Sequence, residues 1–304
     1  MILSLLPAAA AILALTSGPV ASAQTGDAPA QERPAIERLS AWPTLDPKAA
    51  GALTQDLEKV RKAATPEMEE AGEAGVLAAG AAAAPALINA LGKEKDIQAR
   101  LRLETLLDTV TGAAHTRLLA AEFAHKSPHV RAWVLRRVAL FPDAQVRELA
   151  DKAFERAAAA HAKKPDAEGA AEELYLASLC AASAGSSAGF EHLVRAATEN
   201  WGKRGGELRV ALEGLRGDAA TEKLLPLASD SDRKKVVAAL NLLSGCGSRK
   251  AFDAVRPHLD SADNSIRVAA INAMRGIVDG DPPIEKLSAF DAIELAKKWK
   301  ERAL

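Results

Sequence analysis

The chain has 304 residues, with 39 basic and 40 acidic side chains and a formal net charge of −1. This charge balance argues against a nucleic-acid partner, because binding to phosphates ordinarily needs a basic surface that displaces counterions. Only 4% of the residues are aromatic, and few apolar runs alternate with period two, so no β-strands are predicted. Alanine is abundant, and it favours helices whose axes pack closely. The composition therefore predicts an all-α protein.

Residues 1–23 have the features of an export signal. The stretch 3–15 is mostly apolar, and the A-S-A sequence at 21–23 matches the small-residue pattern at which such signals are cleaved. We expect a mature chain that begins at Gln24, is exported to the periplasm or the extracellular space, and has no membrane span. No Lys or Arg precedes the apolar stretch, which departs from the usual signal. An uncleaved N-terminal membrane anchor is therefore the alternative.

A linker and a pair of helices are predicted before the repeats. Residues 24–47 are polar and carry four prolines, as is typical of a linker. Asp46 and the proline after it are expected to open one helix, and a second helix is expected over Pro66–Ala79. The segment 48–79 is therefore predicted to be an N-terminal helical cap.

Four helix-start residues recur at a fixed spacing. Asp96 and Ser127 are 31 residues apart, as are Asp232 and Asp263, and each precedes an apolar run with helical periodicity. Such a period indicates a stack of small units, because one unit alone cannot bury its apolar face. From Ser127 to Asp232 the spacing is 105, which is three periods of 31 plus 12. An insertion is therefore predicted near 158–169.

The second helix of each unit carries a recurring motif. Its closest copies are the sequences DNSIRVAA at 263–270 and SPHVRAWV at 127–134, and weaker copies begin at Asp96 and Asp232. This unit resembles the HEAT repeat, whose second helix often follows the pattern D-x-x-V-R-x-x-A. The resemblance covers residues 80–279.

The resemblance implies a right-handed α-α superhelix, which is a solenoid of about six HEAT-like helix pairs. A helical cap would stand at each end, over 48–79 and 280–304. Such solenoids are armadillo-like in architecture, and the motif says little about activity. By the same resemblance, a ladder of polar residues would hold adjacent repeats together. The ladder residues are Asp96, Arg100, Ser127, Arg131, Asp232, Asp263 and Arg267.

No catalytic constellation is found in the sequence. His125 and His129 have the spacing of two metal ligands on a helix, but Pro128 between them breaks the helix. The GSSAG sequence at 185–189 joins two helices, whereas a serine nucleophile elbow joins a strand to a helix. The GKRGG sequence at 202–206 is predicted to be a flexible turn. The sequence therefore predicts no catalytic residue, metal or cofactor.

The predicted function is to bind a protein or peptide on the concave face of the solenoid. By the 31-residue period, Thr105, Arg136, Asn241 and Asn272 take equivalent outward positions. Trp133 lies near Arg136 and Arg137, and aromatic residues with arginines are favoured at interfaces. The candidate partner-binding residues are Trp133, Arg136, Arg137, Asn241 and Asn272. A second candidate surface is the insertion, with His161, Lys163 and Lys164.

Three further interpretations stay open. In the first, Trp133 packs between repeats, and the neighbouring arginines are solvent-exposed and bind no partner. In another, the chain is an envelope-tethered structural protein that keeps its N-terminal segment. In the last, it is an enzyme similar to the HEAT-like chromophore lyases, which would need an acid and a base that converge in a pocket. No motif of such an enzyme is visible in the sequence.

Overall fold

The computed structural model describes residues 37–302, and in that range every regular element is helical. The predicted all-α class is confirmed. The expected signal at 1–23 and the first part of the linker lie outside the described residues. The α-helices are α1 (Pro47–Arg61), α2 (Pro66–Ala79), α3 (Ala84–Lys93), α4 (Ile97–Val110), α5 (Thr116–Ala120), α6 (Pro128–Ala139), α7 (Arg147–Lys163), α8 (Ala170–Ser183), α9 (Phe190–Leu212), α10 (Asp218–Ala228), α11 (Arg233–Cys246), α12 (Phe252–Val255), α13 (Asn264–Val278) and α14 (Ala289–Glu301). Short 3₁₀ helices lie between some of them: η1 (Gly80–Ala83), η2 (Ala113–His115), η3 (Ala121–Ala124), η4 (Ala144–Val146), η5 (Glu213–Leu215), η6 (Arg249–Ala251) and η7 (Arg256–Asp260).

The four recurring helix-start residues stand at the N-caps of α4, α6, α11 and α13. Asp96 accepts a hydrogen bond from the Ala99 amide at 2.8 Å, and Asp263 accepts one from the Ser265 amide at 2.8 Å. Each bond satisfies an amide that has no partner within its helix. Ser127 differs, because its hydroxyl makes no capping bond. Its helix begins with a proline, which has no amide to satisfy.

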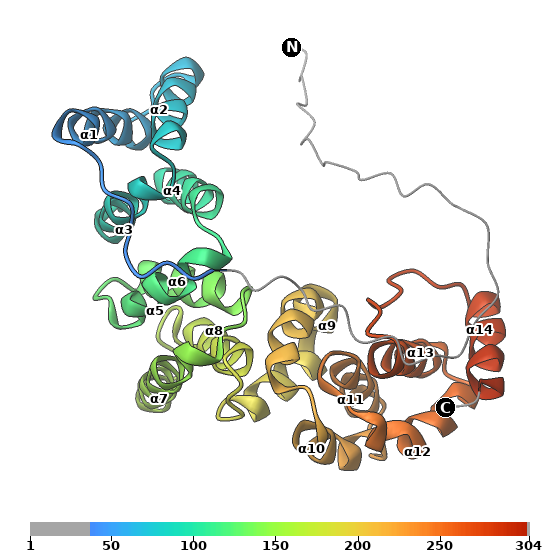
Figure 1. Ribbon diagram of the computed structural model, residues 1–304. Coiled ribbons are helices and arrows are strands. Elements are labelled where there is room, and N and C mark those ends of the chain that lie inside the picture. Colours follow the sequence, from blue (N-terminus) through green and yellow to red (C-terminus); the bar gives the residue numbers. More distant parts are fainter. Residues whose placement is uncertain (1–36, 303–304) are drawn as a thin grey trace. The chain divides into compact units, whose positions relative to one another are not determined.

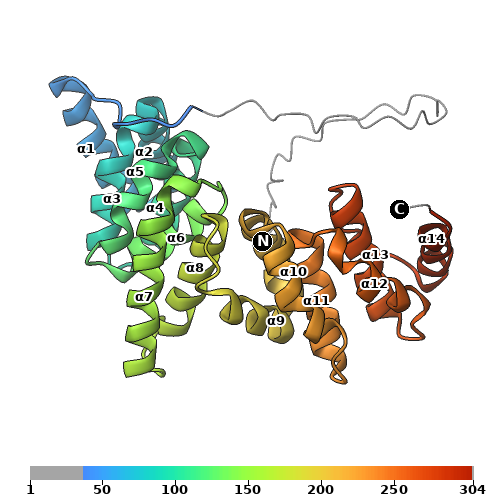
Figure 2. The same ribbon diagram turned by 60° about the horizontal axis from the view of Figure 1, so that its bottom comes forward.

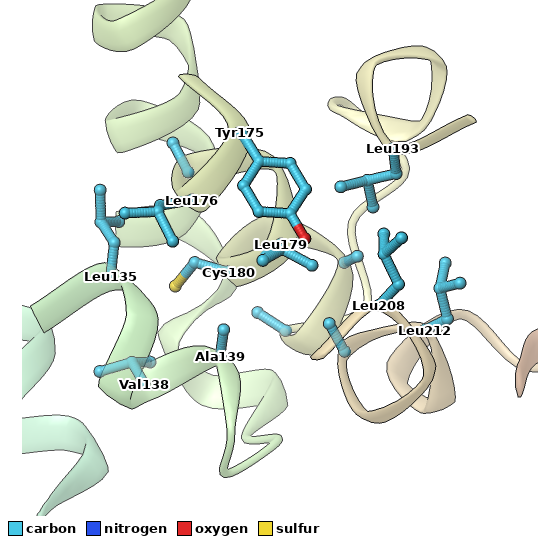
Figure 3. Packing of buried hydrophobic residues seen from close by; sticks show 14 of the residues in the cluster. Leu135, Val138, Ala139, Tyr175, Leu176, Leu179, Cys180, Leu193, Leu208 and Leu212 are labelled. Atoms are coloured by element: carbon cyan, nitrogen blue, oxygen red, sulfur yellow. The ribbon is translucent and has the colours of Figure 1, made fainter. Parts of the chain in front are cut away.

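Five of the longer helices pack side by side in series (Figures 1 and 2). The packed pairs are α6 with α8, α8 with α9, α9 with α11, and α11 with α13. Every residue of α8 from Leu174 to Ser183 is buried. Figure 3 shows Leu176 and Leu179 of α8 between Leu135 of α6 and Leu208 of α9. Burial of each such leucine contributes about 1.5–3 kcal/mol, so the core supplies much of the stability.

Helices α11 and α13 approach closely at one glycine. A Cβ atom at Gly276 would overlap with the carbonyl oxygen of Ser244. Only glycine therefore allows the two helix backbones to meet at this point. This approach positions α11 and α13 as the two adjacent surfaces that line the groove described below.

Helix α9 contains a bend that the sequence did not predict. Asn200 has φ −155° and ψ 53°, so the helix changes direction there. The GKRGG sequence at 202–206 lies in the second half of α9, and its prediction as a flexible turn is wrong. Leu208 and Leu212 of this half are fully buried. Their packing outweighs the roughly 1 kcal/mol that each glycine costs a helix.

The part of the predicted linker that is described, residues 37–46, packs on the helices. The Leu39 amide donates to the Ala114 carbonyl at 2.8 Å. Arg38 pairs with Asp143 at 3.3 Å, and the ring of Trp42 stacks on that of His115 with 5.4 Å between centroids. This stretch is therefore attached to η2 and to the turn between α6 and η4.

One helical stretch among residues 37–302, Pro66–Lys93, is long and apolar enough to cross a membrane by length and composition. Its most apolar window has a mean hydropathy of 1.7 and is 39% buried inside the protein. The stretch comprises α2, η1 and α3, and the chain turns at Gly80, where φ is 56°. Leu87 and Leu91 of α3 are fully buried and belong to the hydrophobic core.

Candidate functional site

Several of the predicted ladder residues join neighbouring helices. Arg131 of α6 donates from Nε and Nη2 to the two carboxylate oxygens of Glu173 on α8, at 2.7 and 2.8 Å. Its Nη1 also donates to the His125 carbonyl at 2.9 Å. Asp263 at the start of α13 accepts from Arg233 of α11, and Arg100 of α4 contacts the ring of His129 on α6.

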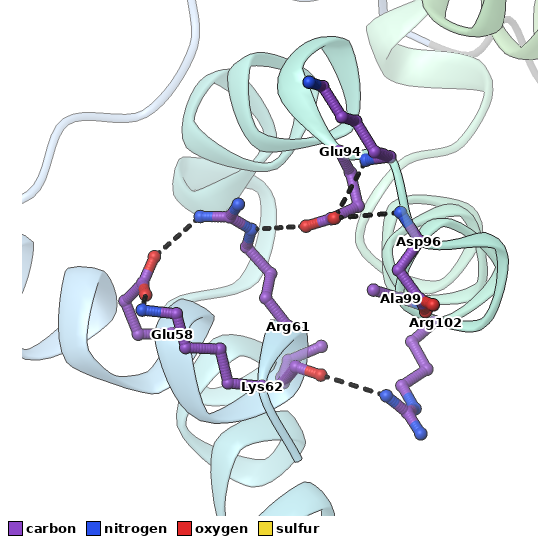
Figure 4. Close-up of polar contacts among 9 residues, drawn as sticks. Glu58, Arg61, Lys62, Glu94, Asp96, Ala99 and Arg102 are labelled. Carbon is purple, nitrogen blue, oxygen red and sulfur yellow. Dashed lines mark hydrogen bonds and ion pairs between the residues drawn. The ribbon is translucent and has the colours of Figure 1, made fainter.

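The other ladder residues act within their own unit. Asp96 and Asp232 only cap their own helices, and Arg267 donates to the Ser261 carbonyl at 2.6 Å in the turn before its own helix. A polar junction of a related kind ties the N-terminal helices to the first pair. Arg61 of α1 donates to Glu94 at 2.7 Å, and Glu94 accepts the Asp96 amide at 3.2 Å (Figure 4).

The structure places the predicted aromatic and arginine cluster mostly inside the protein. Trp133 is only 2% exposed, and its indole Nε1 donates to Asp108 of α4 at 3.0 Å. Arg137 donates to the Asp108 carbonyl at 2.6 Å and stacks on the Phe141 ring at 5.0 Å. Arg136 is the exposed member, with 47% of its side chain accessible. Trp133 and Arg137 therefore connect α6 to α4 through their bonds to Asp108.

The two predicted asparagines lie in a groove of about 730 Å³. Three helices form it: the second half of α9, α11 and α13. The segment 280–288, which joins α13 to α14 in Figure 1, is here called the C-terminal strap. Its residues 282–287 form a further wall of the groove. The lining includes Trp201, Gly206, Asn241, Asn272, Pro283 and Ile284. A volume of this size is in the range of ligand sites in proteins.

Asn272 binds the backbone of the C-terminal strap. Its Oδ1 accepts the Ile284 amide at 2.8 Å, and its Nδ2 donates to the Ile284 carbonyl at 3.3 Å. Arg275, one turn further along α13, donates to the Pro282 carbonyl at 3.3 Å and pairs with Asp281 at 3.0 Å. Residues 281–284 have no regular secondary structure, so the bond partners of Ile284 come from α13. These contacts hold the strap along one side of the groove.

Asn241 lies in the same groove with a different environment. It is 8% exposed, and within residues 37–302 its side-chain amide has no hydrogen-bond partner, although its carbonyl accepts from Ser244. Trp201 and the strap stand at opposite sides of this groove, on α9 and beyond α13. Sequence reasoning found both asparagines through their spacing, but it missed Trp201 and the strap. The adjacent prolines at 282–283 signalled a non-helical segment without showing where that segment packs.

A second, smaller cavity of about 320 Å³ lies where α7, α8 and α9 meet. The predicted insertion at 158–169 falls on the end of α7 and the turn into α8. His161 from this region lines the cavity, together with His192, Arg195 and Arg204 of α9. Lys163 and Lys164 are exposed and are not part of its lining.

Tyr175 of α8, which lines this cavity, has two polar neighbours on α9. Its hydroxyl donates to Glu207 at 2.7 Å, and the Arg204 guanidinium stacks on its ring at 3.6 Å. Burial, followed by the Glu207 carboxylate, raises the pKa of Tyr175 above its ordinary value. Burial lowers the pKa of His192, and the charges of Arg195 and His161 add to this effect.

A comparison with models of known protein families gives no match, and a comparison with curated proteins gives none either. Among the described residues, no group of three or more His, Cys, Asp or Glu side chains is arranged to hold a metal ion. The fold and the groove therefore define the protein only as an all-α protein of serially packed helices with a hollow between α9, α11, α13 and the strap.

Proposed function

We propose that this chain is an exported, non-catalytic scaffold that binds a peptide segment of a partner protein. Its helices would form a right-handed solenoid of about six HEAT-like pairs. Two observations support this arrangement: the N-caps of α4 and α6 and those of α11 and α13 are 31 residues apart, and α6, α8, α9, α11 and α13 pack in series. Stacked pairs of this kind offer an extended surface for a partner.

The observation that carries the proposal is the groove around Asn241 and Asn272. Both residues stand on adjacent helices in one hollow, and Asn272 already holds a non-helical stretch of backbone there. An aromatic wall and an unpaired amide are features that favour a peptide over a purely apolar ligand. The groove thus contains two asparagines that the sequence spacing had selected, and its other lining residues are known only from the structure.

Filling the groove is expected to abolish peptide binding without unfolding the protein. A Cβ atom at Gly206 would meet no heavy atom within 4 Å, so Gly206→Leu projects into free space at the groove. Phage-displayed random peptides would be selected on the immobilised full-length chain, and the affinity of the enriched peptides measured. We expect Gly206→Leu to weaken binding by about tenfold or more, which corresponds to about 1.4 kcal/mol.

The matched control is Gly51→Leu on α1. A Cβ atom there also meets nothing within 4 Å, and the residue does not line the groove. Both variants replace a helical glycine by a better helix former, so neither should lose helical content. Peptide binding that survives in Gly206→Leu, or no enriched peptide at all, would contradict a groove-binding function.

The proposed localisation has its own test. Mass spectrometry of the protein isolated from its host is expected to show a mature chain that begins at Gln24, because the A-S-A pattern precedes it. A chain that retains Met1 would instead support the envelope-tethered structural protein. A lyase is the other proposal, and the acid and base that it needs would have to lie in the second cavity, which His161 and His192 line. Native mass spectrometry that shows a retained small molecule, together with no peptide binding, would favour the lyase.

A further inference from the structure

We infer that Asn241 holds one residue of an extended peptide by its backbone N–H and C=O, as Asn272 holds Ile284. The inference rests on the proposed peptide-binding function and deepens it.

The precedent is the pair between Asn272 and the C-terminal strap. One side-chain amide accepts the Ile284 N–H at 2.8 Å and donates to the Ile284 C=O at 3.3 Å. A carboxamide has one acceptor oxygen and two donor hydrogens, so it matches both polar groups of a single residue. The contact uses no side-chain atom of Ile284. It therefore recognises extended backbone rather than a particular amino acid.

Asn241 occupies the equivalent place on the preceding long helix. Asn272 is the ninth residue after the N-cap Asp263, and Asn241 is the ninth after the N-cap Asp232. Helices α11 and α13 pack directly against each other. Packed helices lie roughly 8–10 Å apart, which an extended chain spans in about three residues. A peptide that lies beside the strap, over α11, would thus reach Asn241.

The two asparagines differ in one respect, which is that the amide of Asn241 is unpaired among residues 37–302. Asn272 is 6% exposed and Asn241 is 8% exposed, but the Asn241 amide, which has no partner among residues 37–302, keeps contact with solvent in the groove. A carboxamide that faces the groove with its donor and acceptor free can exchange bound water for the backbone groups of a ligand. The own-chain strap satisfies Asn272, whereas a bound peptide would satisfy Asn241.

The ligand's chemistry follows from these contacts. The residue opposite Asn241 must have a free backbone N–H, which excludes proline at that position. Apolar or aromatic side chains of neighbouring residues would lie against Trp201 and Pro283 of the groove walls. The partner is therefore an extended, non-helical peptide segment. A folded domain with no free extended segment would not fit.

The test is a backbone N-methyl scan of one peptide enriched on the full-length chain. Each synthetic analogue carries one N-methylated residue, which removes one backbone donor and leaves the side chain unchanged. In the wild type we expect one non-terminal position at which methylation weakens binding by about tenfold. In Asn241→Leu, binding should be weaker overall, and methylation at the same position should have no further effect.

Two variants serve as controls. Asn89→Leu alters an exposed asparagine on α3 outside the groove and should leave the whole scan unchanged. Asn241→Asp keeps an acceptor for the peptide N–H but loses the donor to the carbonyl, so the sensitive position should persist at reduced affinity. This variant also keeps the test valid if Asn241→Leu fails to fold.

The outcomes separate the inference from the function on which it rests. If no peptide is enriched on the wild-type chain, the proposed function is contradicted. If peptides are enriched but their methylation profiles are identical in wild type and Asn241→Leu, only the inference is contradicted, because binding would then not use this amide. Enriched peptides that accept proline at each of their positions would also contradict the inference, because no backbone N–H would then be needed.

Discussion

Trp133→Ala is expected to destabilise the protein by about 3–5 kcal/mol, as removal of a buried large aromatic side chain does elsewhere. Trp133 is among the largest fully buried side chains, and its indole also joins α6 to Asp108 of α4. Denaturant unfolding monitored by circular dichroism would measure the loss. The residue was selected from the sequence as a partner-binding anchor, so this experiment decides between the two interpretations.

The conservative variant Trp133→Phe separates packing from binding. It keeps an aromatic ring in the core but loses the hydrogen bond to Asp108, and we expect a loss of about 1–2 kcal/mol. Its affinity for groove-selected peptides should equal that of the wild type, because Trp133 does not line the groove. An unchanged stability of Trp133→Ala, with loss of a partner, would instead identify Trp133 as an interface residue.

Arg131→Ala is expected to lower the free energy of unfolding by about 2–3 kcal/mol, between the values for exposed and fully buried ion pairs. The substitution removes a bidentate pair with Glu173 and leaves that partly buried carboxylate with only Arg156, at 3.5 Å. Arg233→Ala is the matched control, because it breaks the exposed pair between α11 and α13. That change should cost less than about 1 kcal/mol.

The effect of Arg131→Ala should depend on pH. Burial alone would raise the pKa of Glu173, but its bonds to Arg131 and the charge of Arg156 outweigh burial and hold the pKa below its ordinary value. The folded pKa is below the unfolded one, so this stabilisation is fully present above the ordinary glutamate pKa of 4.5. It is lost as the pH falls through the lowered value. The difference between wild type and variant should therefore shrink below that pH, and a constant difference would contradict the ion-pair explanation.

Local chemistry explains why the helix starts could be predicted from the sequence. Asp96, Asp232 and Asp263 each bond an amide within the next three residues, so the capping signal and its effect lie side by side in the chain. The starts of α2 and α4 could be predicted from the sequence for the same reason. The glycine-rich stretch at 202–206 shows the limit of such reasoning. Its local preference is for a turn, and buried neighbours in α9 override it.

The sequence by itself determined the helical class, the positions of the N-caps and the two asparagines that share a register. Only the tertiary structure decided that Trp133 is buried, that Arg131 meets Glu173, and that the strap turns back to bind Asn272. These contacts join residues from 12 to 42 positions apart. Caps and periodicity act over one or two helical turns, whereas such contacts depend on how whole helices pack, which no short pattern records.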